Sequence, residues 1–407
     1  MSALSAGEIP DALQCRQVAP EPPMPSTALW TPMKSSRSRL GLRAGTAALI
    51  AVASLLIGRS LLFHGPFQPP APLPAEGIVD LHCHTAGIGA GNSGCFVSPR
   101  MRSNFRFRIY LDAFGISETD LLRHGDRFLL QKLSRDVAAS HHLQSAVVLA
   151  LDGVVDANGE LDTNRTEVYI PNDFMAEATS RLTNLLFGAS IHPRRPDAVA
   201  RLDRAAAQGA VLVKWIPSIM GIDPADPRCI PFYQRLVHHR IPLLSHTGPE
   251  RSFTSATDAL ADPDRLRLPL EQGVVVIAGH VAGGGESNGV PDLEKLRRLM
   301  KEFPNLYADI SALTLVNRIG HLRATLAAPE CRGRLVYGSD FPLINTALVS
   351  PWYYPLNLTE AQRQTIAAMA SPWDRDIALK QALGVPAEVF TATKKILRLP
   401  SGSGGGP

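Results

Sequence analysis

The sequence has few cysteines, and their spacing excludes the usual roles of clustered thiols. Its five cysteines stand far apart and form no Cys-x-x-Cys pair, at Cys15, Cys83, Cys95, Cys229 and Cys331. An odd number at wide spacing predicts neither a disulfide framework nor a zinc–thiolate site. A single Cys83–Cys95 bridge remains open for an oxidising compartment. We favour the interpretation that these are small buried residues.

An excess of charge of one sign is also missing. The 407 residues include 41 basic and 37 acidic ones, which leaves a formal charge of +4. A surplus this small on a long chain argues against a polyanionic partner. The sequence has no arginine-rich arm of the nucleic-acid-binding kind, no P-loop lysine and no Gly-x-Ser-x-Gly elbow. We therefore exclude nucleic acid and expect a small-molecule substrate, whereas the oligomeric state is open.

Long hydrophobic runs are absent except near the N-terminus. Residues 44–63 are apolar apart from a few positions such as Arg59, and four basic residues precede them, Lys34, Arg37, Arg39 and Arg43. Basic residues followed by an apolar run are typical of a signal anchor or a signal peptide. The charge asymmetry places the N-terminus in the cytoplasm and the rest of the chain on the exported side. A hydrophobic helix packed on the domain is the alternative.

This segment divides the chain into regions of different composition. Proline and small polar residues dominate on both sides of it, which is typical of segments that do not fold alone. The predicted regions are a disordered tail over 1–38, a signal anchor or signal peptide over 39–63, a proline-rich linker over 64–76, a catalytic barrel over 77–400 and a flexible tail over 401–407.

From residue 77 onward, short apolar runs alternate with helix-like stretches, an α/β pattern. The runs cover residues 77–84, 145–153, 185–193, 210–217, 241–248, 274–282, 306–311 and 334–342. Eight buried strands that alternate with helices predict a (β/α)8 TIM barrel. A doubly wound open sheet is the alternative, but no glycine-rich phosphate loop follows the first run. Residues 85–144 form a long insertion, which we expect to lie over the barrel mouth.

Metal-liking side chains recur at the ends of these strands. His82 and His84 alternate on the first strand, so both imidazoles face the same side. Single residues follow on strands four, five, six and eight, at Lys214, His246, His280 and Asp340. Each residue alone is more often structural. Together they fall at the carboxyl ends of the strands, where barrel enzymes hold their active sites.

The strand-end motifs resemble those of the amidohydrolase superfamily. They are VDLHCH, VKWIP, LLSHTG, AGHVA and YGSDFP, in that order within residues 77–395. Among its branches, the chain looks most like the relatives of aminocarboxymuconate-semialdehyde decarboxylase. The resemblance implies that His82, His84 and Asp340 bind a divalent metal and that His246 is a fourth ligand in one-metal members. His280 would then polarise the substrate or position water.

The number of metals depends on Lys214. If this lysine is carboxylated, as in two-metal relatives, it bridges two ions and His246 and His280 bind the second. We favour one metal, Zn²⁺, with Mn²⁺ or Fe²⁺ as alternatives. Such an ion lowers the pKa of bound water to about 7, and Asp340 is expected to accept the proton and pass it to the leaving group.

The function we predict is metal-dependent hydrolysis of an amide, ester or lactone bond. A metal-dependent decarboxylase and a membrane-anchored binding protein without turnover are the alternatives. Glu250 and His192 each follow a strand end and are weaker candidates for substrate contact. A loop-stabilising ion pair is the alternative for Glu250, and a structural role is the favoured alternative for His192. The four arginines within residues 98–108 are either a solvated basic face or a site for an anionic substrate.

Overall fold

The computed structural model describes residues 45–57 and 77–399. Eight parallel strands form one sheet in which each strand neighbours the next along the chain. They are β1 (Ile78–Cys83), β3 (Leu143–Leu149), β5 (Leu185–Ala189), β6 (Leu212–Trp215), β7 (Leu243–His246), β8 (Val276–Gly279), β11 (Leu306–Asp309) and β12 (Leu335–Val336). All eight predicted strands are present, and most of them are shorter than the apolar runs that predicted them.

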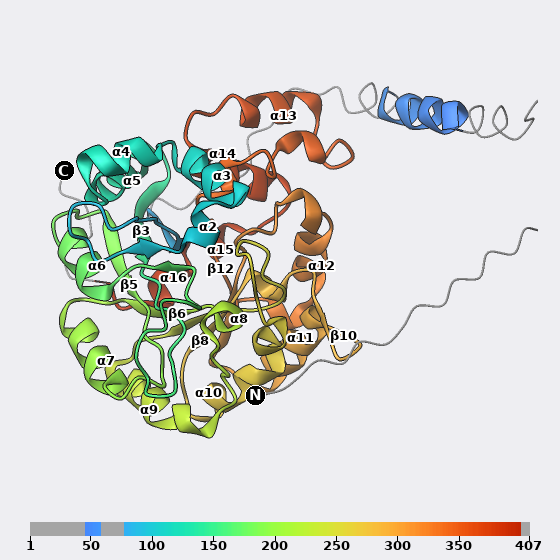
Figure 1. The fold of residues 1–407 in the computed structure, drawn as a ribbon. Helices are drawn as coiled ribbons and strands as arrows, with labels where there is room; N and C mark the ends of the chain where they lie inside the picture. The colour runs from blue at the N-terminus through green and yellow to red at the C-terminus, as the bar shows by residue number, and fades with distance from the viewer. Residues whose placement is uncertain (1–44, 58–76, 400–407) are drawn as a thin grey trace, which may run out of the picture. The chain divides into compact units, whose positions relative to one another are not determined.

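The first and last strands meet, so the sheet closes on itself. Cys83 pairs in parallel with Phe341. The amide of His84 donates to the carbonyl of Phe341 over 2.8 Å, and the amide of Asp340 donates to the carbonyl of His82 over 2.9 Å. Together with the eight-stranded order, these contacts make the predicted TIM barrel, seen with its helices around the strands in Figure 1.

Helices follow most of the strands and cover the outside of the barrel (Figure 1). The larger ones are α5 (Arg127–Ala138), α6 (Asn172–Thr179), α7 (Ala198–Ala207), α9 (Ile230–His239), α11 (Asp292–Glu302), α12 (His321–Ala327), α13 (Glu360–Ala367) and α14 (Pro372–Ala382). The shorter ones are α8 (Pro217–Met220), α10 (Arg267–Glu271), α15 (Ala387–Thr391) and α16 (Thr393–Ile396).

Local sequence explains where these helices begin and end. In α7 the side chains of Ala198, Leu202 and Ala205 are buried, the spacing of one helical face. Gly209 follows this helix with a φ of 88°, a conformation that glycine adopts without a steric penalty. Acidic residues in the first turn of α11 favour its positive N-terminal end.

Two layers of apolar side chains hold the barrel together. Strand side chains that point inward form a small central core, which includes Val79, Leu81, Val147, Leu244 and Ile277. Alternate side chains point outward and pack under the helices in a larger core. Each fully buried aliphatic side chain stabilises the fold by about 1.5–3 kcal/mol, so the strand ends are presented on a rigid frame.

The insertion after β1 contains the short strand β2 (Phe96–Val97) and the helices α2 (Pro99–Arg102), α3 (Phe105–Phe114) and α4 (Glu118–His124), followed by α5. β2 pairs with β4 (Val168–Tyr169), and a second small hairpin joins β9 (Glu286–Ser287) to β10 (Val290–Pro291). Side chains from α3 line the cavity at the carboxyl ends of the strands. This agrees with the prediction that the insertion lies over the mouth.

Four of the five cysteines lie in the described residues, and all four are buried and free. The predicted alternative of a Cys83–Cys95 bridge is therefore wrong. Burial raises the pKa of the Cys95 thiol to about 12, which leaves it unreactive at neutral pH.

Near the N-terminus, residues 45–57 form a helix with exposed side chains. Within the described ranges, no helix combines the length and the apolar character needed to cross a bilayer. The membrane-spanning prediction for residues 44–63 is not supported by this finding, and its two ends lie outside the described residues. So do the predicted tails over 1–38 and 401–407 and nearly all of the linker over 64–76. Export of the catalytic domain stays a prediction.

Candidate metal centre

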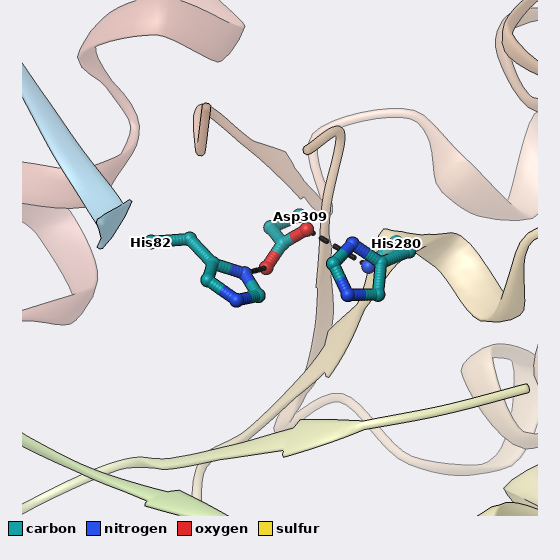
Figure 2. A group of neighbouring side chains, drawn as sticks. All are labelled: His82, His280 and Asp309. Atoms are coloured by element: carbon teal, nitrogen blue, oxygen red, sulfur yellow. Dashed lines mark hydrogen bonds and ion pairs between the residues drawn. The ribbon is translucent and has the colours of Figure 1, made fainter. Parts of the chain in front are cut away.

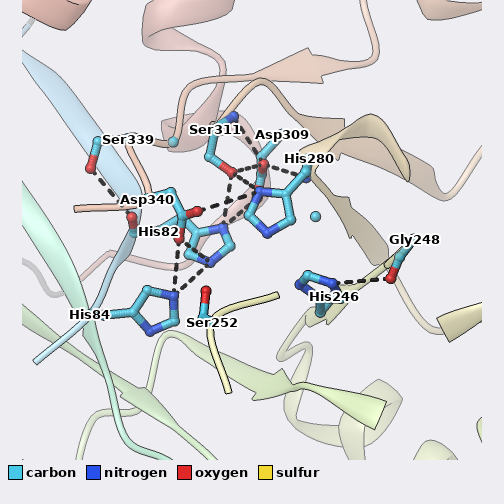
Figure 3. Close-up of polar contacts among 12 residues, drawn as sticks. His82, His84, His246, Gly248, Ser252, His280, Asp309, Ser311, Ser339 and Asp340 are labelled. Atoms are coloured by element: carbon cyan, nitrogen blue, oxygen red, sulfur yellow. Dashed lines mark hydrogen bonds and ion pairs between the residues drawn. The ribbon is translucent and has the colours of Figure 1, made fainter. Parts of the chain in front are cut away.

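Two histidines of β1 and the aspartate after β12 converge at the barrel mouth. His82 Nε2 lies 3.2 Å from His84 Nε2. Asp340 Oδ1 lies 3.1 Å from His84 Nε2 and 3.5 Å from His82 Nε2. These three ligand atoms form a nearly equilateral triangle (Figure 3). His82 and Asp340 are buried, whereas the side chain of His84 is 30% exposed, so the triangle has one open side.

This donor set fits a divalent metal. Zinc–nitrogen bonds are about 2.0–2.1 Å long, so tetrahedral ligands stand about 3.4 Å apart. The three separations in the triangle lie close to that value. Two neutral imidazoles and a carboxylate suit Zn²⁺, and Mn²⁺ or Fe²⁺ less closely. The predicted ligands His82, His84 and Asp340 are therefore brought together in an arrangement that could hold one ion.

Asp309, at the end of β11, holds His82 in the orientation that metal binding requires. Its Oδ2 atom accepts a hydrogen bond from His82 Nδ1 over 2.8 Å (Figure 2). The proton on Nδ1 leaves the lone pair of His82 on Nε2, which faces the triangle. A carboxylate behind a metal-binding histidine fixes its tautomer in this way. Sequence analysis missed Asp309, although the carboxylate interrupts an apolar strand.

His280 belongs to the same network. Asp309 Oδ1 accepts the backbone amide of His280 over 2.9 Å, and His280 Nδ1 lies 2.8 Å from Ser311 Oγ. Because the Ser311 hydroxyl donates to Asp309, His280 Nδ1 is the donor to Ser311 and its Nε2 lone pair is free. His82, His280 and Asp309 form a second compact group (Figure 2), but this carboxylate is already committed to hydrogen bonds.

Both His280 and Asp340 adopt left-handed backbone conformations, with φ of 59° and 63°. Non-glycine residues pay a steric penalty there, of order 1–3 kcal/mol. The surrounding contacts hold each conformation in place, through Asp309 for His280 and through the carbonyl of His82 for Asp340. In these backbone conformations both side chains point toward the ligand triangle.

Burial sets the charge states of these groups. It lowers the pKa of His82 to about 4, and the neighbouring Lys214 contributes. Burial also moves the pKa of His280 well below its ordinary value. For Asp340 burial acts in the opposite sense, but His280 and His82 outweigh it and hold the carboxyl pKa well below its usual range. At neutral pH the site therefore offers neutral imidazoles and an ionised carboxylate, the forms that bind metals.

Lys214 reaches the same point from β6. Its Nζ lies 2.8 Å from His82 Nε2, and the side chain is buried. Burial lowers its pKa to about 8, although Asp309 and Asp340 counteract this effect. The amine therefore lies where the strand-four residue was predicted, next to the ligand triangle.

His246 is less closely associated with the triangle. Its ring lies 4.9 Å from that of His280 between centroids, and its Nε2 donates to the carbonyl of Gly248 over 3.2 Å. Among the described residues, neither compact group of ligand atoms includes it. His246 Nδ1 instead faces Glu250 Oε2 over 3.5 Å, and Figure 3 shows the ring apart from the triangle.

Two weaker candidates occupy different places. Glu250 lines the cavity beside the metal centre, and one of its oxygens accepts the amide of Ser252 over 2.6 Å. His192 does not line this cavity. Its two ring nitrogens are used within the protein, by the carbonyl of Met220 and the amide of Arg194. These contacts fit the structural alternative for His192, because both ring nitrogens are already used within the protein.

The arginines of residues 98–108 do not line the cavity. Arg102 pairs with Glu118 on the surface, and Arg106 lies 5.2 Å from the ring of Phe105. The alternative of a solvated basic face fits these contacts better than an anion site.

The sequence matches the amidohydrolase family model over residues 138–371, more than half of the chain. The chain belongs to the amidohydrolase family. Lys214, His246, His280, Asp309 and Asp340 lie within the matched residues, whereas the two histidines of β1 precede them. Members of this family typically bind a divalent metal, which agrees with the ligand triangle. No curated protein matches the sequence.

Several solved structures are similar to this amidohydrolase. An uncharacterised TIM-barrel protein from Bordetella bronchiseptica is 16% identical, with 78% of this chain and 99% of that chain covered and a TM-score of 0.47. A 2,6-dihydroxybenzoate decarboxylase from Rhizobium is 14% identical, with 79% and 98% covered and a TM-score of 0.41. The 5-carboxyvanillate decarboxylase from Sphingomonas paucimobilis is 11% identical, with 80% of this chain and 99% of that chain covered and a TM-score of 0.41. The family assignment rests on the sequence match.

Proposed function

We propose that this amidohydrolase is a metal-dependent hydrolase that cleaves an amide, ester or lactone bond of a small molecule. The observation that carries the proposal is the position of the two carboxylate oxygens of Asp340. Oδ1 faces the two ligand histidines, whereas Oδ2 faces His280 Nδ1 over 3.8 Å. One oxygen is thus available as a ligand and the other as a proton acceptor.

The side chains around the triangle have separate tasks in this proposal. His82, His84 and Asp340 would hold the metal, which supplies Lewis acidity and makes water more acidic when bound. The free Nε2 lone pair of His280 would accept a hydrogen bond from the reacting water and position it. Asp340 Oδ2 would take a proton from water and return it to the leaving group, which is general acid–base catalysis.

Lys214 would remain an ammonium in a one-metal site. Its Nζ lies 2.8 Å from His82 Nε2, so it would contact a substrate bound at the triangle. A second metal requires carboxylation of this amine, with His246 and His280 as further ligands. The bond between His246 Nε2 and Gly248 leaves only Nδ1 for that purpose.

Metal analysis and product analysis test the proposal together. We expect close to one equivalent of zinc or manganese in the purified protein, and its loss in the His82→Ala/His84→Ala variant. Asp340→Asn should lower turnover of an ester or lactone library by about 10³-fold, in the range seen when acid–base groups are removed. Two equivalents would instead indicate carboxylated Lys214.

A decarboxylase would use the same ligands, so the products must be separated. Release of CO2 without consumption of water would identify the enzyme as a decarboxylase. Formation of a new carboxylate together with an alcohol or amine would support hydrolysis. A protein that binds metal but converts no member of either substrate set would favour the non-catalytic alternative.

A further inference from the structure

A cavity of about 240 Å³ opens above the metal centre. Its floor contains His84, Lys214 and Asp340, and part of its wall is apolar, with Met101, Phe107 and Phe114 from the insertion. An occupant that fits such a wall has an apolar body. Polar groups that face the same space then decide what else the occupant must carry.

One of these polar groups, Arg318, has no hydrogen-bond or ion-pair partner within residues 45–57 and 77–399. It lies at the end of the short 3-10 turn Val316–Arg318 and lines the cavity. Its Nη1 atom is buried and makes no hydrogen bond to any described residue. A guanidinium stays charged at all relevant pH values, and a buried charged donor without an acceptor is costly. The cavity therefore presents an unsatisfied cation.

The stem of Arg318 lies beside Gly283 in the loop after β8. A Cβ atom at Gly283 would lie in ordinary contact with Arg318 Cδ, at 3.4 Å, but only 2.8 Å from the carbonyl of His280. The loop that carries His280 thus packs against the stem of Arg318. The guanidinium and the metal centre are connected through a shared, closely packed loop.

A second arginine on the cavity wall provides a contrast. Arg251 donates to Asp258 over 2.6 Å and to the carbonyl of Glu250 over 2.9 Å, and its side chain is 68% exposed. Arg251 is therefore satisfied by the protein. Arg318 is surrounded by the charges of Asp340, Glu250 and Asp309, but it forms an ion pair with none of them.

We propose that Arg318 binds a carboxylate of the substrate, so that the enzyme acts on organic acids with an apolar body. This inference rests on the proposed function, because it takes the same cavity as the substrate site. The planar guanidinium matches a carboxylate with two parallel hydrogen bonds. The nearby carboxylates favour a singly charged group over a doubly charged phosphate. The labile bond of such an acid would lie at the metal centre, with the carboxylate at the rim.

Calorimetric titration of the metal-free full chain tests this inference, since no ion is then present to bind the probe. The probes are benzoate, phenylacetate and 3-phenylpropionate, the neutral amides of each, and phenyl phosphate. We expect at least one acid to bind about 10-fold or more tightly than its amide. Arg318→Met should weaken that acid by about 10–100-fold, the range for a hydrogen bond to a charged group, and leave its amide unchanged.

Arg251→Met is the matched control and should leave acid binding unchanged. Should Arg318→Met fail to fold, Arg318→Lys keeps the charge without the fork and should give an intermediate affinity. Equal binding of acid and amide, equal losses in the two arginine variants, or no binding of any acid at millimolar concentration would overturn the inference. Tighter binding of phenyl phosphate would overturn the carboxylate assignment. Zinc titration of the same proteins reports separately on the proposed function.

Discussion

Two buried clusters at the carboxyl ends of the strands each combine an aspartate with a histidine, and they differ in how their polar atoms are used. The first cluster follows β3 and β5 and contains Asp152, His192 and Arg195. The second contains His82 near the end of β1, Asp309 at the end of β11 and Asp340 after β12. Sequence analysis selected a histidine from each cluster as a candidate.

In the first cluster every ligand-like atom has a partner. Both oxygens of Asp152 accept from Arg195, over 2.6 and 2.9 Å, and Oδ2 also accepts the amide of His192 over 2.8 Å. Both ring nitrogens of His192 form hydrogen bonds with backbone groups. A site in which all donors and acceptors are paired can stabilise the chain but has nothing left for a ligand.

In the second cluster Asp309 is fully paired, but His82 and Asp340 each direct a ligand atom at the same point. His82 uses Nδ1 for Asp309 and points Nε2 at the triangle. Burial and residue type therefore do not distinguish a structural histidine from a candidate metal ligand. The difference lies in whether the remaining lone pairs converge on one point.

The largest expected effect is a loss of stability when the ion pair of the first cluster is broken. Asp152→Asn leaves the buried Arg195 without its carboxylate and should lower the free energy of unfolding by about 3 kcal/mol. Denaturant titration measures the loss, and metal content should remain at the wild-type value. Loss of metal in this variant would show that the two clusters are not independent.

The matched exchange in the second cluster, Asp309→Asn, should act on metal affinity. The variant keeps the shape of the side chain but weakens the acceptor that orients His82. Removal of such a group typically costs about 10–100-fold in metal affinity. Competition with a chromogenic zinc chelator measures the change. An unchanged affinity would mean that His82 keeps its orientation without Asp309.

The smallest effect concerns pH and His192. Burial lowers the pKa of this ring from 6.5 to about 4, so the folded protein binds the proton less well than the unfolded chain. The contribution of the neutral His192 ring to the free energy of unfolding is complete above pH 6.5 and is lost as the pH falls toward 4. Between pH 7 and pH 5 the loss is about 1–2 kcal/mol. His192→Gln should lack this part of the pH dependence, measured as the wild-type minus variant difference in unfolding free energy. A difference that stays constant with pH would contradict the assignment.

The frame of the barrel was predictable because buried parallel strands leave continuous apolar runs, and all eight runs became strands. His82, His84 and Asp340 were predictable because strand alternation and the motif order place them at one rim. Asp309 carried a signal that was overlooked, since a carboxylate 29 residues after His280 and 31 before Asp340 keeps the register of one βα unit. Arg318 gave no signal, because it lies in an irregular loop whose path depends on tertiary packing. The hydrogen-bond partners of the His192 ring could not be predicted either, since both are backbone groups, whose positions depend on the fold.

The seam between β1 and β12 joins residues that are far apart in the sequence, and the amide of Asp340 donates to the carbonyl of His82 across it. Contacts this distant in sequence form late in folding, because the intervening chain must be ordered first. During synthesis, an emerging chain carries both β1 histidines long before it carries Asp340. The complete set of candidate ligands therefore exists only after the last strand has left the ribosome and the barrel has closed, so the finished fold, and not the nascent chain, presents the arrangement that could hold a metal.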